Sequence, residues 1–152
     1  MLLASERHRG FWELANLMTR PSSQLGAVKR WSDKPVDVQL DVIDALPCAS
    51  ETFLAQLDTI TLPAARSLRV ACEVRARVDK EPCALDEALQ HVRFRAPSSD
   101  ASARDLSEAV LVRHLVARCR DREPTFMTDA RRWSALKPEP IASALASRLA
   151  DR

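Results

Sequence analysis

The chain of 152 residues contains only two glycines and no tyrosine, and aromatic residues make up 5% of it. Strands favour aromatic and β-branched residues, and tight hairpin turns draw on glycine, so both deficits disfavour a β-sheet. Alanine, leucine, arginine and glutamate, which favour helices, are abundant. We therefore expect an all-α fold in one domain covering residues 1–152, a length that suits a single hydrophobic core.

The chain also lacks the features that mark membrane segments and common catalytic or cofactor sites. No apolar run approaches the roughly 18 residues of a membrane span, so we expect no membrane partner. Gly10 and Gly26 lie too far apart for a phosphate-binding loop, and there is no Gly-x-Ser-x-Gly or Cys-x-x-Cys motif. The sequence thus predicts no cofactor, no metal site and no enzymatic activity.

Four cysteines, Cys48, Cys72, Cys83 and Cys119, have spacings that match no disulfide framework. No secretory signal precedes them. We interpret them as reduced, mostly buried thiols, and we expect the protein to be cytoplasmic. The basic residues are mostly arginine, which is common in genomes rich in G and C and favours a bacterial origin.

Nine prolines divide the chain into helix-sized pieces, because proline is best tolerated in loops and in the first helical turn. Within the pieces, apolar residues recur with the helical period. An exposed loop is expected at residues 97–102, where Ser102 and Asp105 resemble a capping box. The expected helices cover residues 5–19, about 23–31, 33–46, 50–61, 63–79, 82 to near 97, 102 to about 122, 126–133 and 138–149.

The faces of two of these helices carry specific expectations. In the short second helix, capped by Ser22 or Ser23, the residues Leu25, Val28 and Trp31 share the inward face. In the third helix three acids point outward, and we interpret them as a solvated face, with a site for a cation or a basic partner as the alternative. These acids are Asp37, Asp41 and Asp44.

Eight or nine short helices predict a compact irregular bundle, with stacked helical hairpins of solenoid type as the alternative. A weak recurrence raises the second possibility. The segment Arg30-Trp31-Ser32-Asp33-Lys34-Pro35 resembles Arg132-Trp133-Ser134-Ala135-Leu136-Lys137-Pro138, which has one extra residue. Coincidence in a sequence rich in arginine and punctuated by proline explains the recurrence equally well.

Two surfaces are candidates for partner binding. The net charge is only +2, but arginines cluster near the C-terminus, where either a basic docking face or a solvated helix surface would account for them. Trp12, Trp31 and Trp133 are expected in the core, although Trp31 and Trp133 could instead line a binding groove. The candidate partner-binding residues are Trp31, Trp133, Arg118, Arg122, Arg131 and Arg132.

Residues 13–18, a polar break and residues 24–31 loosely resemble the helix-turn-helix of phage repressors. The resemblance implies that residues 20–34 present Ser22, Ser23, Gln24, Lys29 and Arg30 to DNA. However, the spacing is longer than in that motif, and Pro21 occupies the turn. The first hypothesis is therefore a non-catalytic protein–protein interaction module, such as an adaptor, regulator or assembly component. DNA binding through Gln24, Lys29 and Arg30 is the alternative.

Overall fold

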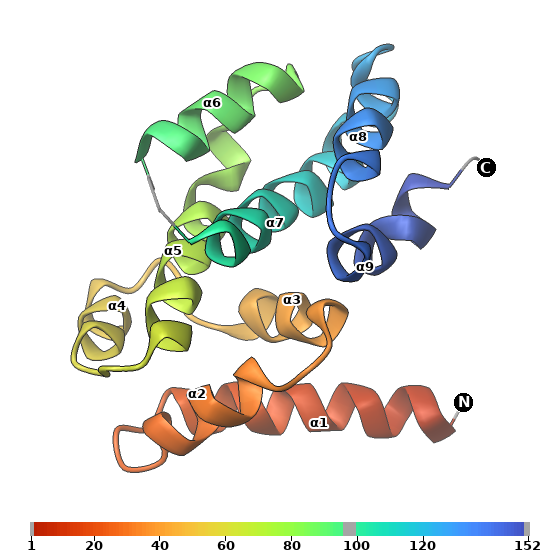
Figure 1. Ribbon diagram of the computed structural model, residues 1–152. Coiled ribbons are helices and arrows are strands. Elements are labelled where there is room, and N and C mark those ends of the chain that lie inside the picture. The colour runs from red at the N-terminus through yellow and green to blue at the C-terminus, as the bar shows by residue number, and fades with distance from the viewer. Residues whose placement is uncertain (1, 96–99, 151–152) are drawn as a thin grey trace.

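Prolines and short polar segments separate the helices of the computed structural model, which describes residues 2–95 and 100–150 (Figure 1). Over these ranges the chain forms nine α-helices, one short 3₁₀ helix (η1) and no strand, so the predicted all-α fold is confirmed. None of these helices is long and apolar enough to cross a bilayer. The elements are α1 (Leu2–Met18), α2 (Gln24–Ser32), α3 (Val36–Ala45), α4 (Glu51–Asp58), α5 (Pro63–Arg77), η1 (Val78–Lys80), α6 (Leu85–Arg95), α7 (Ala101–Cys119), α8 (Phe126–Ala135) and α9 (Glu139–Leu149).

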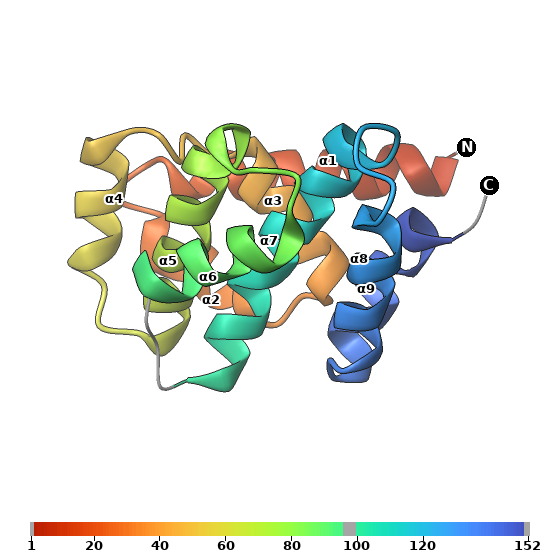
Figure 2. The same ribbon diagram turned by 90° about the horizontal axis from the view of Figure 1, so that it is seen from above.

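The bundle is built around α7, which packs against α5, α6, α8 and α9 (Figures 1 and 2). A helix enclosed in this way must bury side chains on all its faces rather than along one stripe. The polar side chains of Ser107, Glu108 and Arg113 are accordingly buried together with the predicted apolar stripe. On one side of this centre lie α1, α2 and α3, and both ends of the described chain lie at the end of the molecule opposite α4 (Figures 1 and 2).

The apolar residues that recur with the helical period in α5 to α9 are buried, because this periodicity reports the buried side of a helix directly. Several helix ends differ from the prediction. Ser50, where the expected fourth helix begins, caps α4, and its Oγ accepts a hydrogen bond of 3.2 Å from the amide of Phe53. Helix α6 starts at Leu85, three residues after the predicted Pro82. Helix α5 ends at Arg77, and η1 follows it directly.

The predicted capping box at the start of α7 is wrong. Asp100 is the N-cap, and its Oδ1 accepts a hydrogen bond of 2.9 Å from the amide of Ser102, which already lies in the helix. Asp105 instead pairs with Lys137 at 3.1 Å. The other end of α7 lies at Cys119 rather than Arg122. Of the loop expected at residues 97–102, residues 97–99 lie outside the described ranges.

Helix α2 buries two of the three residues of the predicted face, Val28 and Trp31, but not the third. Leu25 is exposed, whereas its neighbour Gln24 is buried. The amide Nε2 of Gln24 donates to the carbonyl of Met18 at 2.7 Å and to Oε1 of Gln56 at 3.2 Å, so the buried amide is paired. Ser23 occupies the N-cap position, but its hydroxyl donates to the carbonyl of Leu17 and does not cap the helix.

The cysteines form two disulfide bonds, Cys48–Cys72 and Cys83–Cys119, and leave no free thiol. The prediction of reduced thiols is therefore wrong. The first bond joins the segment between α3 and α4 to α5, and the second joins the segment before α6 to the last residue of α7. Helix packing brings the Cα atoms within 4.8 and 5.5 Å, a proximity that the spacing along the chain does not reveal.

The two recurring Arg-Trp-Ser segments form similar helix–Lys-Pro–helix corners. Pro35 has φ −56° and ψ 154°, and Pro138 has φ −55° and ψ 152°. Their packing differs. The indole of Trp31 donates to the carbonyl of Gln39 in the following helix, whereas the indole of Trp133 donates to the side chain of Glu108 in α7. The compact bundle is confirmed, and the stacked-hairpin alternative is not.

Candidate functional site

Two of the three tryptophans lie in the core, as the favoured interpretation predicted. Trp31 is 2% exposed and Trp133 6%, and the indole N–H of each donates a hydrogen bond inside the protein. Trp31 lines an open pocket of about 300 Å³ together with residues of α3, α5, α7 and α9, but its side chain is almost fully covered, so little of the indole is open to a partner. The core interpretation is wrong for Trp12, which is 44% exposed and stacks on Phe11.

The C-terminal arginines are used largely inside the protein. Arg118 donates to the carbonyl oxygens of Val78 at 3.1 Å and Asp79 at 2.7 Å, and also to that of Glu81. These carbonyls lie in η1 or directly after it, and that of Val78 also accepts the amide of Glu81 at 3.1 Å. At the end of α9, Arg131 donates to the carbonyl of Leu149 at 2.7 Å. Two of the predicted partner-binding arginines therefore help to hold helix ends in place.

The remaining predicted residues stay at the surface. Arg122 and Arg132 are exposed, and Arg132 lies 3.7 Å from Asp129. Lys29 and Arg30 are exposed on α2. The surface role implied for Gln24 by the DNA-binding resemblance is wrong, because Gln24 is 4% exposed and its amide is bonded inside the protein.

Two acids of the row on α3, Asp41 and Asp44, face basic side chains of the same chain, although Asp44 stays at the surface as the solvated-face interpretation predicted. Arg113 of α7 pairs with Asp41, and His114 Nε2 lies 2.7 Å from Asp44 Oδ1. Burial raises the pKa of Asp44, but the hydrogen bond with His114 and the charges of His114, Arg113 and Arg75 outweigh it and hold the pKa below its ordinary value. Both acids are thus paired within the chain.

A buried carboxylate, Glu108, connects α6, α7 and α8. Arg93 donates to both of its oxygens at 3.1 and 2.9 Å, the indole of Trp133 donates at 2.9 Å, and Lys137 lies at 3.4 Å. Burial raises the pKa of Glu108, but the hydrogen bonds from Arg93 and Trp133 and the charge of Lys137 lower it below the ordinary value. Because its oxygens are used internally, Glu108 holds the fold together and is not available to a ligand.

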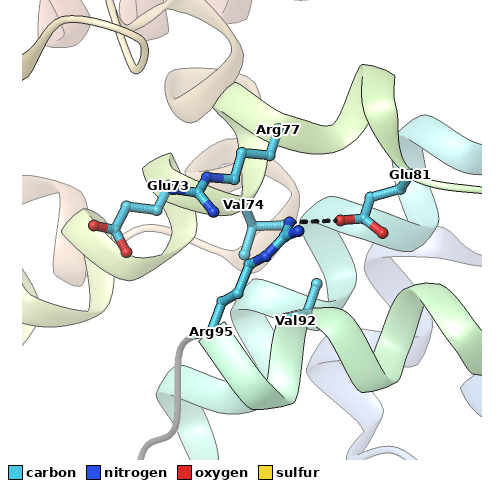
Figure 3. A pocket seen from close by; sticks show the side chains of 6 residues that line it. All are labelled: Glu73, Val74, Arg77, Glu81, Val92 and Arg95. Carbon is cyan, nitrogen blue, oxygen red and sulfur yellow. Dashed lines mark hydrogen bonds and ion pairs between the residues drawn. The ribbon is translucent and has the colours of Figure 1, made fainter.

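An open polar site lies between α5 and α6, where a cleft of about 230 Å³ is bordered by side chains of both helices and by Glu81 (Figure 3). The valines Val74 and Val92 form its apolar wall and are mostly buried. The side chains of Arg77, at the end of α5, and Arg95, at the end of α6, both border the opening. That of Arg77 extends toward the Glu73 side, and that of Arg95 extends toward Glu81 (Figure 3).

The two carboxylates at this cleft are already neutralised by cations. Glu81 is 8% exposed, and its Oε1 accepts a hydrogen bond of 3.2 Å from Nη1 of Arg95. The other oxygen of Glu81 lies 2.8 Å from Nδ1 of His91. Glu73 pairs with Arg69 one turn earlier on α5, and its carboxylate points away from Arg95 (Figure 3).

The arginines of the cleft, by contrast, keep unused donors. A guanidinium group carries five N–H donors, and Arg95 uses only the Nη1 bond to Glu81 within the described structure. Arg77 is exposed and forms no hydrogen bond or ion pair with the described residues. The arrangement can therefore accept an anionic group through both guanidinium planes.

Sequence analysis did not identify this site, because Arg77 and Arg95 lie in different helices and form no motif. Only the packing of α6 beside α5 brings them together (Figure 1). A larger cleft of about 560 Å³ lies where the α4–α5 connection meets the start of α7, but Arg69 at its edge is held by Asp58 and Glu73. We therefore take the α5–α6 cleft as the candidate site.

Comparisons of the chain with protein families, with curated proteins and with solved structures give no match.

Proposed function

We propose that this chain is a non-catalytic helical module that docks a partner protein, as an adaptor, regulator or assembly component. The observation that carries the proposal is the last turn of α6, where Phe94 is 87% exposed and is followed by Arg95 at the α5–α6 cleft. Aromatic and arginine side chains are enriched at protein interfaces and supply much of their binding energy. A partner covering the end of α6 would bury Phe94 and contact Arg95 together.

The surroundings of the potential catalytic groups support a non-catalytic role. All four cysteines are in disulfide bonds, so no thiol is available as a nucleophile. His91 and His114 each lie within hydrogen-bond distance of a carboxylate, and neither has a hydroxyl group as a hydrogen-bond partner in the described structure. Over the same ranges, no three His, Cys, Asp or Glu side chains converge into a group that could hold a metal ion.

DNA binding through residues 20–34 remains the competing function. It depends on Lys29 and Arg30, which are exposed, and it no longer includes Gln24. Contacts of lysine and arginine with phosphates would make such binding strongly salt-dependent. Retention of duplex DNA at low salt, with loss on Arg30→Ala, would favour this function over the docking module.

The two disulfide bonds bear on the compartment in which the module works. Disulfide bonds persist in oxidising compartments and are rare in the cytoplasm of most organisms. We propose an oxidising environment for the folded protein rather than the cytoplasm expected from the sequence. Recovery of the protein from its native cell with thiol-blocking reagent present throughout would test this, since cytoplasmic protein would carry four blocked thiols.

Photo-cross-linking tests the docking proposal directly. A benzophenone amino acid is placed at position 94, and in a matched control at position 25, where the exposed Leu25 lies on α2. We expect a discrete protein adduct in the native cell from position 94 and none from position 25. The same adduct must be lost when the unlabelled wild-type chain is added in excess, whereas Phe94→Ala should compete poorly. Equal labelling from both positions, or nucleic acid as the main adduct, would contradict the proposal.

A further inference from the structure

We propose that the α5–α6 cleft binds a carboxylate group of an acidic side chain on the partner protein, held between the guanidinium groups of Arg77 and Arg95. This inference rests on the proposed docking function and specifies its chemistry. Both carboxylates at the cleft are already paired, while most of the guanidinium donors are not. Glu81 is bonded to Arg95 and His91, and Glu73 is paired with Arg69.

The donors of the cleft define the charge of the ligand. Arg77 has no partner among the described residues, and Arg95 is fixed by a single bond to the buried Glu81. That bond positions the Arg95 guanidinium and leaves its other N–H groups for a ligand. An arginine fork matches a carboxylate in plane and spacing, so the two guanidinium groups that border this cleft can both donate to one carboxylate.

The size and wall of the cleft favour a side chain over a free small molecule. Its volume of about 230 Å³ lies below the roughly 300–1,000 Å³ that is usual for small-molecule sites. The apolar wall formed by Val74 and Val92 can cover the methylene groups of a glutamate, while the arginines at the rim reach its carboxylate. Phe94, exposed on the same turn as Arg95, provides an adjacent apolar contact for the residues that flank this acid.

The test uses N-acetyl-glutamate N-methylamide as the probe and the corresponding glutamine derivative as its uncharged control. Binding is followed by NMR through the side-chain Nε–Hε signals of Arg77 and Arg95 in the full chain. We expect both signals to shift with the glutamate probe and the glutamine control to bind at least about tenfold more weakly, since a hydrogen bond to a charged group contributes about 1.5–3 kcal/mol. Equal binding of the two probes would overturn the proposal.

Two variants assign the effect to the cleft. Arg77→Gln should weaken binding of the glutamate probe about tenfold. It should leave the unfolding transition unchanged, because Arg77 has no partner in the described structure. Arg66→Gln, which removes an exposed arginine of α5 outside this cleft, should bind the probe like the wild type. Equal losses of probe binding in both variants would show that the probe responds only to the overall positive charge, and would overturn the assignment to the cleft.

Inorganic phosphate is tested as a second probe with the same NMR signals. If phosphate shifts the same signals at lower concentration than the glutamate probe, the ligand is a phosphate and the carboxylate assignment is wrong. The docking function is tested separately by cross-linking from position 94, which does not require Arg77. If the chain forms the position-94 adduct but does not bind the glutamate probe, the carboxylate inference is overturned and the docking function is not.

Discussion

The indole nitrogen of Trp133 in α8 donates a hydrogen bond of 2.9 Å to Oε1 of Glu108 in α7. Both side chains are buried, and the same carboxylate binds Arg93 of α6 and lies close to Lys137 between α8 and α9. A buried carboxylate needs several partners, because each unpaired oxygen carries a desolvation cost. This one group therefore connects three helices and a helix–helix corner.

Trp133→Phe should lower the free energy of unfolding by about 1–3 kcal/mol, because it removes one donor from a buried carboxylate while preserving most of the apolar volume. Urea denaturation measures the difference. Trp12→Phe is the matched control, and we expect a change within about 0.5 kcal/mol because Trp12 is largely at the surface. Equal losses in the two variants would show that the bond to Glu108 contributes nothing specific.

The free energy of unfolding should fall as the pH is lowered through the acidic range. The pKa values of Glu108 and Asp44 are lowered in the folded protein, so the unfolded chain takes up protons first. The stabilisation is complete above the ordinary carboxyl pKa values of about 4 and is lost as the pH falls through the lowered folded values. Denaturation curves between about pH 6 and pH 3 measure this slope.

Glu108→Gln provides the control for the pH dependence. It removes one of the titrating groups, so the variant should be less stable near neutral pH but should lose less stability on acidification. Asp86, an exposed acid of α6, serves as the comparison through Asp86→Asn, which should retain the wild-type slope. An unchanged slope in Glu108→Gln would contradict the assigned role of Glu108.

The denatured but unreduced protein should expose no reactive thiol, and reduction should release four, because both cysteine pairs are bonded. A thiol-reactive dye in denaturant measures this directly. Replacing Cys83 and Cys119 together by alanine should lower the free energy of unfolding by about 2–4 kcal/mol, since the bond restricts the unfolded chain. Four reactive thiols before reduction would show that the pairs do not form.

Gln24→Ala should destabilise the fold by about 1–3 kcal/mol, because the carbonyl of Met18 and the side chain of Gln56 lose their buried donor. The neighbouring variant Leu25→Ala should change the free energy of unfolding by less than about 0.5 kcal/mol, since Leu25 is half-exposed. Thermal or urea unfolding of the pair compares the two neighbouring positions of α2. A larger loss for Leu25→Ala would contradict the burial of Gln24 in place of Leu25.

The helices were predictable because their signals are local. Proline positions and apolar spacing depend only on neighbouring residues, so the stripes of α8 and α9, from Phe126 to Trp133 and from Ile141 to Leu149, follow from the sequence. In α2 this method placed Val28 and Trp31 correctly but missed one position, because the hydrogen-bonded Gln24 packs inward and Leu25 stays at the surface. Apolar spacing takes no account of a polar side chain that finds partners far along the chain.

The sequence by itself determined the all-α composition, most inward faces and the cap at Ser50, since helix propensity, period and capping act within a few residues. Only the tertiary structure decided which cysteines pair, why Glu108 can be buried in the central helix, and that Arg118 binds carbonyl groups. The α5–α6 cleft was also decided by the tertiary structure, since Arg77 and Arg95 line one cleft only because α5 and α6 pack together. Such relationships join residues distant along the chain, and their energy depends on burial and geometry that only the assembled bundle sets.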